Sequence, residues 1–143
     1  MKILLTGGTG FIGRNLAVKL ADMGHEVLCL VRNKSRAGWM SDHPGLEPIE
    51  GDLEKKESIA PRVSDVDLVF HLAGLTKARN RDEFIRVNGE GTGILLDALL
   101  QGMKRIKKIL YVSSLAVAGP HTSQDPARES GTVSPITDYG ESK

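Results

Sequence analysis

The sequence is poor in cysteine and in long apolar runs, and neither sign of charge dominates. Its single cysteine, Cys29, cannot form an internal disulfide, and its place in an apolar run indicates a buried structural thiol. Lys and Arg number 19 against 18 for Asp and Glu, and the formal net charge of +1 offers no field that would favour nucleic acid or an anionic membrane. We therefore expect neither of these among its partners.

The sequence also lacks a membrane span and a metal-ligand pattern. The apolar run at residues 3–5 soon gives way to glycines and is too short for a secretory leader or a span, so a cytoplasmic location is expected. No metal site is expected, because metal-ligand spacing is absent among His25, His43, His71 and His121. A basic stretch after the longest predicted helix is interpreted as a solvated helix end, and it consists of Lys104, Arg105, Lys107 and Lys108.

The composition is that of a globular protein, and the sequence alternates between predicted strands and predicted helices. The 143 residues, 40% hydrophobic and 26% charged, suffice for one domain, residues 1–143, but not for a separate substrate domain. Apolar runs predict strands at residues 2–6, 26–31, 46–49, 67–71 and 108–112. Helices are predicted at residues 11–23, 57–63 and 81–101, with another beginning near residues 136–139. This α/β alternation is typical of a Rossmann-like, doubly wound parallel sheet, truncated after about five strands.

A glycine-rich turn between the first strand and its helix is the first chemical motif. It reads Thr6-Gly7-Gly8-Thr9-Gly10-Phe11-Ile12-Gly13, with glycines spaced G-x-x-G-x-x-G. Such a turn lets the backbone approach a pyrophosphate, whose charge then meets free N–H groups and the positive end of the helix dipole. We therefore predict a dinucleotide-binding turn formed by Gly7, Thr9, Gly10, Phe11, Ile12 and Gly13.

The end of the second strand bears on which dinucleotide binds. Where a carboxylate would ordinarily hold the ribose 2′-hydroxyl of NAD, this sequence has Arg32. A guanidinium can bind the 2′-phosphate bidentately, so NADP is favoured, with NAD as the other candidate. Alternatively, Arg32 is solvated, and Asn33 or backbone groups serve the ribose. Trp39 and Met40, in the loop that follows, either cover the adenine or anchor the loop.

A tyrosine and a lysine four residues apart form a second chemical motif. Tyr139 and Lys143 would be neighbours roughly 5–6 Å apart on one helical face. A free phenol titrates near ~10, and an adjacent ammonium stabilises the phenolate, so the pair is suited to proton exchange. Ser113 and Ser114 follow the fifth strand, at the edge where open α/β sheets bind ligands.

Together these motifs resemble the extended short-chain dehydrogenase/reductase superfamily, which includes nucleotide-sugar epimerases and dehydratases. The resemblance covers the whole chain and includes Gly51-Asp52-Leu53, His71-Leu72-Ala73-Gly74 and the helical Asn88. It implies that the Asp52 carboxylate accepts a hydrogen bond from the adenine amino group. It also implies cofactor contacts at Leu53, Leu72, Ala73, Gly74 and Asn88.

The same resemblance implies catalytic roles at the end of the chain. Tyr139 would transfer the proton, Lys143 would also bond the nicotinamide ribose, and Ser114 would bond the substrate oxygen, with Ser113 as its alternative. We therefore predict an NAD(P)-dependent oxidoreductase or epimerase/dehydratase that acts by hydride and proton transfer at a secondary alcohol or ketone. Its substrate is a small molecule, with nucleotide sugars among the candidates.

The resemblance further implies that the parent enzyme is a homodimer and that more chain follows Lys143. Because the substrate pocket of relatives lies largely in that later region, we expect the 143 residues alone to be inactive, with a frayed last helix. Two alternatives stay open: a non-catalytic NAD(P)-binding sensor or assembly protein of the same fold, and a fragment that folds without binding anything. The intact Ser114, Tyr139 and Lys143 argue against the sensor.

Overall fold

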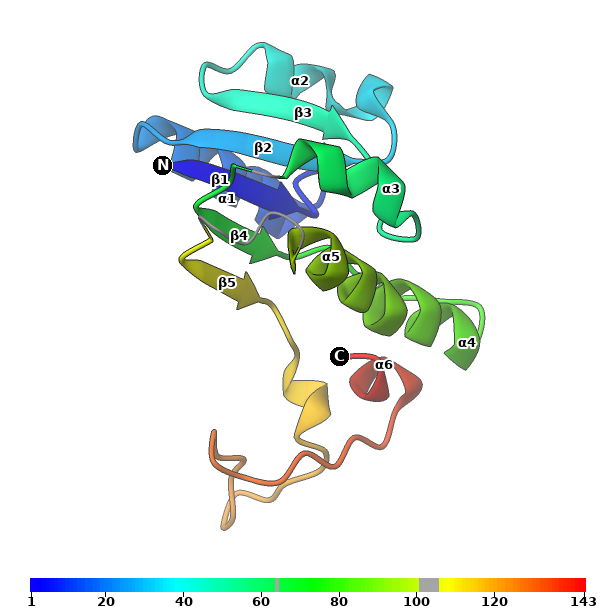
Figure 1. Cartoon of the computed structure of the whole chain (residues 1–143). Helices are drawn as coiled ribbons and strands as arrows, with labels where there is room; N and C mark the ends of the chain where they lie inside the picture. Colours follow the sequence, from blue (N-terminus) through cyan, green and yellow to red (C-terminus); the bar gives the residue numbers. More distant parts are fainter. Residues whose placement is uncertain (64, 101–105) are drawn as a thin grey trace.

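A parallel sheet forms the centre of the protein in the computed structural model, which describes residues 1–63, 65–100 and 106–143. Within this part of the chain the sheet has five strands in the order β3-β2-β1-β4-β5 (Figure 1). They are β1 (Lys2–Thr6), β2 (Glu26–Val31), β3 (Leu46–Glu50), β4 (Leu68–His71) and β5 (Lys108–Tyr111). The predicted Rossmann-like fold is confirmed, and each strand agrees with its prediction to within one residue.

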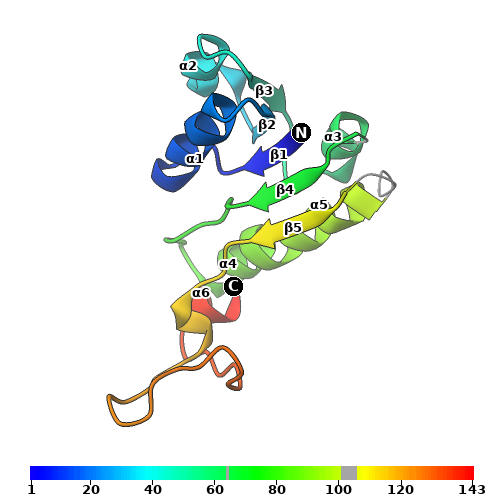
Figure 2. The ribbon, with the colours of Figure 1, turned by 90° about the vertical axis from the view of Figure 1, so that its left-hand side faces the viewer.

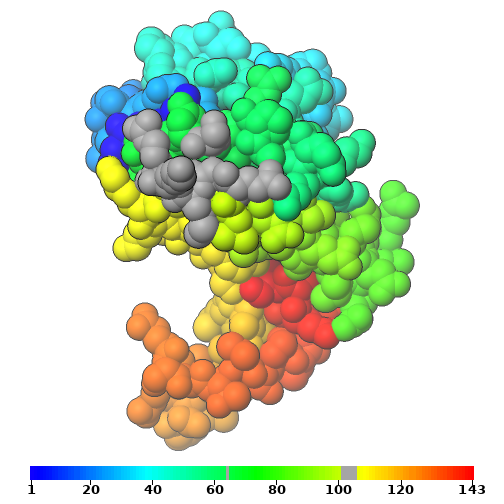
Figure 3. All heavy atoms as spheres, viewed as in Figure 1, coloured from blue at the N-terminus to red at the C-terminus, as the bar shows by residue number. Residues whose placement is uncertain are grey.

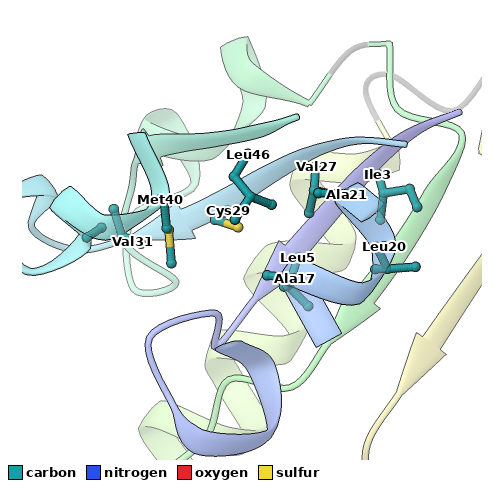
Figure 4. Packing of buried hydrophobic residues seen from close by; sticks show 11 residues of the cluster. Ile3, Leu5, Ala17, Leu20, Ala21, Val27, Cys29, Val31, Met40 and Leu46 are labelled. Atoms are coloured by element: carbon teal, nitrogen blue, oxygen red, sulfur yellow. The ribbon is translucent and has the colours of Figure 1, made fainter. Parts of the chain in front are cut away.

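Helices cover both faces of the sheet. The helices α1 (Phe11–Asp22) and α2 (Gly38–Ser41) lie on one face, and α3 (Lys56–Ile59) and α5 (Gly91–Leu100) lie on the other (Figure 2). Because side chains alternate along a strand, Ile3 and Leu5 of β1 enter the core on the α1 side, whereas Leu4 enters the core on the α5 side. Figure 4 shows the α1 side, where Ala17 and Leu20 approach these strands. The sheet is therefore doubly wound.

The segment after β2 is more regular than predicted. A 3₁₀ helix, η1 (Lys34–Ala37), leads directly into α2, where the sequence suggested a loop. Met40 is fully buried in the core on the α1 side, and Trp39 packs against that core with the guanidinium of Arg14 4.4 Å from its ring centroid. Of the two interpretations of Trp39 and Met40, the structure favours the hydrophobic anchor.

The long helix predicted at residues 81–101 is not one continuous α-helix. It consists of α4 (Arg81–Phe84), a π-helical segment η3 (Ile85–Glu90) and α5, and Gln101 lies outside the described residues. Within η3 the side chain of Asn88 is almost completely buried and bonds both backbone groups of Leu75. The prediction was wrong here because helical periodicity does not reveal an inserted π turn, which long-range contacts of this kind stabilise.

Two further predicted helices differ from expectation, one in its type and one in its end. The helix predicted at residues 57–63 begins as α3 and continues as the 3₁₀ helix η2 (Ala60–Arg62), which has a proline in its first turn. The last helix, α6 (Asp138–Glu141), begins where predicted but ends before Lys143. Between it and the short η4 (Leu115–Val117), the loop at residues 119–135 extends away from the rest of the molecule (Figure 3). No helix among the described residues is long and apolar enough to cross a membrane.

Candidate functional site

A cavity of about 260 Å³ opens at the carboxyl ends of β1, β2 and β4. Because β1 lies between β2 and β4, the chain runs in opposite directions from it, and such a switch point is where open α/β sheets bind ligands. Most of the predicted cofactor residues line this cavity, namely Gly7, Thr9, Gly10, Arg32, Asp52, Leu53, Leu72, Ala73 and Gly74. Prediction missed other lining residues, namely Thr6, Leu30, Val31, Gly51, Glu54, Leu75 and Val87.

The glycines of the turn have different structural tasks. Gly7 has a φ of +77°, and a Cβ there would lie 2.8 Å from the backbone nitrogen of Ala73. A Cβ on Gly13 would lie 2.1 Å from the carbonyl oxygen of Gly7, so helix α1 can begin this close to the turn only without a side chain. A Cβ on Gly10 would meet only that same carbonyl, at 3.4 Å. Gly10 is therefore not required by packing, and it leaves room at the mouth of the cavity.

The N-terminus of α1 is suited to an anion. Gly10 is its N-cap and provides no side-chain cap, and the first turn contains no acidic residue. The side chains of Phe11 and Ile12 are exposed, so they do not obstruct the end of the helix. Free N–H groups and the helix dipole at such an end attract a phosphate group. The turn therefore fits the pyrophosphate of a dinucleotide.

The two charged residues that were predicted to bind the adenosine half of a dinucleotide both line the cavity. Arg32 is exposed, lines the cavity and forms no ion pair with any described residue. One carboxylate oxygen of Asp52 accepts the backbone N–H of Glu54 at 3.1 Å, which fixes the side chain beside the cavity. Asn33, the alternative ribose ligand, instead caps η1 by accepting the N–H of Ser35. This geometry leaves the guanidinium of Arg32 available to an anionic ligand.

Tyr139 and Lys143 do not share one α-helix as predicted, because α6 ends at Glu141. Lys143 nevertheless lies beside the end of β5, because its backbone oxygen accepts from the hydroxyls of Tyr111 at 3.3 Å and Ser113 at 3.2 Å. Its Nζ lies 3.3 Å from where a Cβ on Gly74 would be, so the ammonium adjoins the cavity. Desolvation by burial lowers the pKa of Lys143, and the phenol of Tyr139 opposes that shift.

The two candidate serines differ in the bonds that their hydroxyl groups make. Ser114 caps η4, and its Oγ accepts the backbone N–H of Ala116 at 3.2 Å, which leaves its hydroxyl proton available. Ser113 donates from its Oγ to the backbone oxygen of Lys143 at 3.2 Å. The elements η4 and α6 are closely packed, because a Cβ on Gly140 would lie 2.5 Å from the Ala116 carbonyl oxygen. The structure thus brings Ser113 into contact with Lys143 and packs η4, which Ser114 caps, against α6.

Buried polar contacts support this site and were missed from the sequence. Asn88 donates from Nδ2 to Oγ of Ser142 at 2.9 Å, and Ser142 in turn donates to the carbonyl of Tyr139 at 2.8 Å. His71 bonds Thr6 and Thr92 with its two ring nitrogens. A histidine at the end of an apolar strand was the available signal, because a buried polar side chain requires partners.

The other polar features of the structure lie outside this site. A hollow of about 480 Å³ on the outer side of α4 and η3 is lined mostly by charged residues, including Arg79, Arg81 and Glu83. It is larger than the cavity beside the glycine turn, but it is separate from the predicted motifs. Among the described residues, no cluster of three or more His, Cys, Asp or Glu side chains could hold a metal ion. Lys107 pairs with Asp67, whereas Lys104 and Arg105 lie outside the described residues.

Comparison with known proteins identifies relatives over most of the chain. The model of the "NAD dependent epimerase/dehydratase family" matches residues 3–143. A ketoreductase of Stigmatella aurantiaca, which acts on a 4-hydroxy-2-methyl-3-oxo-4-farnesyl-3,4-dihydroquinoline-1-oxide according to its name, is 39% identical over 82% of the chain and 34% of its own length. The photosystem II assembly factor Ycf39 of a Synechocystis strain is 31% identical over 82% of the chain and 35% of its own length.

A solved structure also matches the whole chain. The dTDP-glucose 4,6-dehydratase DesIV of Streptomyces venezuelae, with NAD and TYD bound, superposes with a TM-score of 0.87. It is 25% identical, and the match covers 100% of this chain and 48% of that one. The chain spans about a third of the length of the curated relatives that it matches first.

Proposed function

The chain belongs to the NAD dependent epimerase/dehydratase family, and from this we propose that it is the cofactor-binding part of an NAD(P)-dependent oxidoreductase or epimerase/dehydratase. The observation that supports this most is the position of one cavity, which has the glycine turn on one side and Gly74 on the other. Because the ammonium of Lys143 lies beside Gly74, one of the predicted catalytic residues adjoins the lining of this cavity.

The proposed cofactor is NADP, with NAD as the second candidate. The backbone of Gly7 and Gly10 and the N-terminus of α1 would hold the pyrophosphate. The Asp52 carboxylate would accept from the adenine amino group, and Arg32 would bind the 2′-phosphate through its guanidinium. The preference for NADP rests on Arg32 alone, since the DesIV structure contains NAD.

The proposed reaction is hydride and proton transfer at a secondary alcohol or ketone. When bound, the nicotinamide would supply or accept the hydride. The hydroxyl of Tyr139 would exchange a proton with the substrate oxygen, and the ammonium of Lys143 would stabilise the phenolate form of Tyr139. The free hydroxyl proton of Ser114 would be donated to the same substrate oxygen. The tilted contact between the rings of Phe84 and Tyr139, with centroids 5.7 Å apart, supports the position of the phenol.

The substrate and the oligomeric state of the whole protein are also proposals. The substrate would be a small molecule, and the nucleotide sugars handled by relatives such as the dTDP-glucose dehydratase are one candidate class. We propose a homodimer that buries the outer side of α5, where Leu96 is 41% exposed and Leu100 is 55% exposed. Sedimentation of the whole protein as a monomer would contradict this proposal.

A second candidate function is a non-catalytic, cofactor-binding assembly role. It is favoured by the 31% identity to a photosystem II assembly factor. The two functions share the cofactor cavity and differ only in the use of Tyr139, Lys143 and Ser114. They can therefore be separated by removing the hydroxyl of Tyr139 alone.

The Tyr139→Phe variant of the complete protein tests the catalytic proposal. It should lose at least ~100-fold in turnover of a carbonyl substrate and keep its affinity for NADPH, because only the proton-transferring group is deleted. Affinity is measured by titrating NADPH fluorescence, with the unsubstituted protein as reference. Turnover that survives in this variant would mean that another acid acts, and the absence of NADPH and NADH binding in the unsubstituted protein would refute the cofactor role.

A further inference from the structure

We propose that His71 is a positioning residue that couples the cofactor-facing turn at residues 72–74 to the π-helical segment η3. It does so as one fixed neutral tautomer, hydrogen-bonded at both ring nitrogens. The proposal deepens the function proposed above, and only its nucleotide-binding test rests on that function.

The position of His71 places it between three elements. It is the last residue of β4 and pairs in register with Thr6, the last residue of β1. Its side chain is almost completely buried, with Nδ1 2.6 Å from Oγ1 of Thr6 and Nε2 2.9 Å from Oγ1 of Thr92 in α5. The imidazole therefore bridges the glycine-turn strand and the helix that continues η3.

The two His71 contacts do not by themselves give the tautomer, and we assign the donors and acceptors from the other bonds of the two threonines. Thr92 donates its single hydroxyl proton to the carbonyl of Asn88 at 2.5 Å, so toward His71 it can only accept. Nε2 of His71 must therefore carry the proton. In a neutral imidazole Nδ1 is then the acceptor, and the hydroxyl of Thr6 donates to it. The oxygen of Thr6 still accepts the backbone N–H of Ala73 at 3.1 Å.

The surroundings of the imidazole favour its neutral form. Burial, together with the smaller effect of the nearby charge of Lys143, lowers the pKa of His71 to about 4. The imidazole stacks on the ring of Tyr111 with centroids 5.4 Å apart, and Nζ of Lys143 lies 4.6 Å from the centroid of that same ring. A second proton would remove the acceptor that the Thr6 hydroxyl uses. The bridge therefore depends on the neutral tautomer.

Each end of the bridge leads to a different part of the site. At the Nδ1 end, Thr6 holds the amide of Ala73, which lines the cavity and packs against Gly7. At the Nε2 end, Thr92 holds the backbone of Asn88, whose side chain bonds the backbone N–H of Leu75 at 2.7 Å. The amides of Ala73 and Leu75 are therefore separate reporters of the two ends.

Two substitutions separate the two ends. His71→Asn places a carbonyl oxygen near the position of Nδ1 and keeps an acceptor for Thr6, but it has no group that reaches Thr92. His71→Gln carries its amide N–H near the position of Nε2 and keeps a donor for Thr92, but it leaves Thr6 without its acceptor. Hydrogen exchange of the two amides, followed by NMR in the chain Met1–Lys143, measures each end without any cofactor.

We expect each variant to accelerate hydrogen exchange at a different one of the two amides. In His71→Asn the Leu75 amide should exchange about 10-fold faster, while the Ala73 amide stays protected. In His71→Gln the Ala73 amide should exchange about 10-fold faster, while the Leu75 amide stays protected. The factor of about 10 corresponds to the loss of about one net hydrogen bond in each variant. Long-range ¹H–¹⁵N correlation should show the Nε2–H tautomer of His71 in the unsubstituted chain. An Nδ1–H tautomer, or equal acceleration of both amides in both variants, would overturn the proposal. If either variant does not fold, the tautomer measured in the unsubstituted chain decides the proposal.

Nucleotide binding by the two variants tests whether the bridge affects the cofactor-facing turn. The Kd for NADPH should rise about 5- to 10-fold more in His71→Gln than in His71→Asn, because only the former loosens Ala73. The opposite order would overturn the coupling to the cofactor turn. If the unsubstituted chain binds neither NADPH nor NADH, the proposed function fails, whereas the exchange and tautomer results still decide the role of His71.

Discussion

Nδ2 of Asn88 donates to Oγ of Ser142 at 2.9 Å, although 54 residues separate them in the sequence. Ser142 is 5% exposed, and its own hydroxyl donates to the carbonyl of Tyr139. This pair joins the π-helical segment η3 to the short helix α6. Since α6 has only four residues, its place beside the cavity depends on contacts of this kind rather than on intrinsic helix stability.

The first prediction concerns this link. Ser142→Ala should lower the free energy of unfolding by about 1–3 kcal/mol, because the buried amide of Asn88 loses an acceptor without gaining water. Urea unfolding followed by circular dichroism measures the change, and Ser130→Ala, at an exposed loop position, serves as the matched control. A Ser142→Ala variant as stable as the control would show that the link contributes nothing.

The second prediction contrasts two glycines of the same turn. Gly10→Val should leave the fold intact and abolish binding of NADPH. A Cβ at Gly10 meets only the Gly7 carbonyl, at 3.4 Å, but the side chain would occupy the approach to the pyrophosphate. Gly13→Ala should instead lower the free energy of unfolding by about 2 kcal/mol or more, because its Cβ would overlap the Gly7 carbonyl. Calorimetric titration and thermal unfolding of both variants check this. A Gly10→Val variant with unchanged affinity would remove the turn from the proposed site.

The third prediction tests the choice of cofactor. The unsubstituted chain should bind NADPH more tightly than NADH, and Arg32→Asp should reverse that order, because a carboxylate repels the 2′-phosphate and accepts from the 2′-hydroxyl. Arg36→Asp makes the same change of charge at an exposed residue that does not line the cavity. Isothermal titration of both nucleotides against the three proteins measures the effect. A preference of the unsubstituted chain for NADH would contradict it.

The fourth prediction is a dependence of stability on pH. The pKa of His71 is lowered to about 4 from an ordinary value of 6.5, so the folded state binds its proton less readily than the unfolded state. The stability due to neutral His71 is therefore fully present above pH 6.5 and is lost as the pH falls from there toward 4, by up to about 3 kcal/mol. His71→Asn should show a shallower loss over this window in urea unfolding, whereas His121→Asn, at an exposed residue, should follow the unsubstituted chain. Identical slopes in all three proteins would refute the assignment.

The sequence by itself determined the βα order and the class of the fold. Apolar runs and helical spacing are local patterns, and the steric needs of Gly7 and Gly13 are visible in the spacing of the glycines. The cavity residues from Gly7 to Gly74 could also be placed at one edge of the sheet, because the carboxyl ends of parallel strands share that edge.

Only the tertiary structure decided which polar groups support that edge. The π-helical turn at Asn88, the bridge through His71 and the burial of Met40 depend on partners elsewhere in the chain, such as Ser142 and Thr6. The bond between Thr6 and His71 spans 65 residues. Periodicity reports only which face of an element is apolar, whereas the partner of a buried polar group is set by how the elements pack. That packing depends on the whole chain at once.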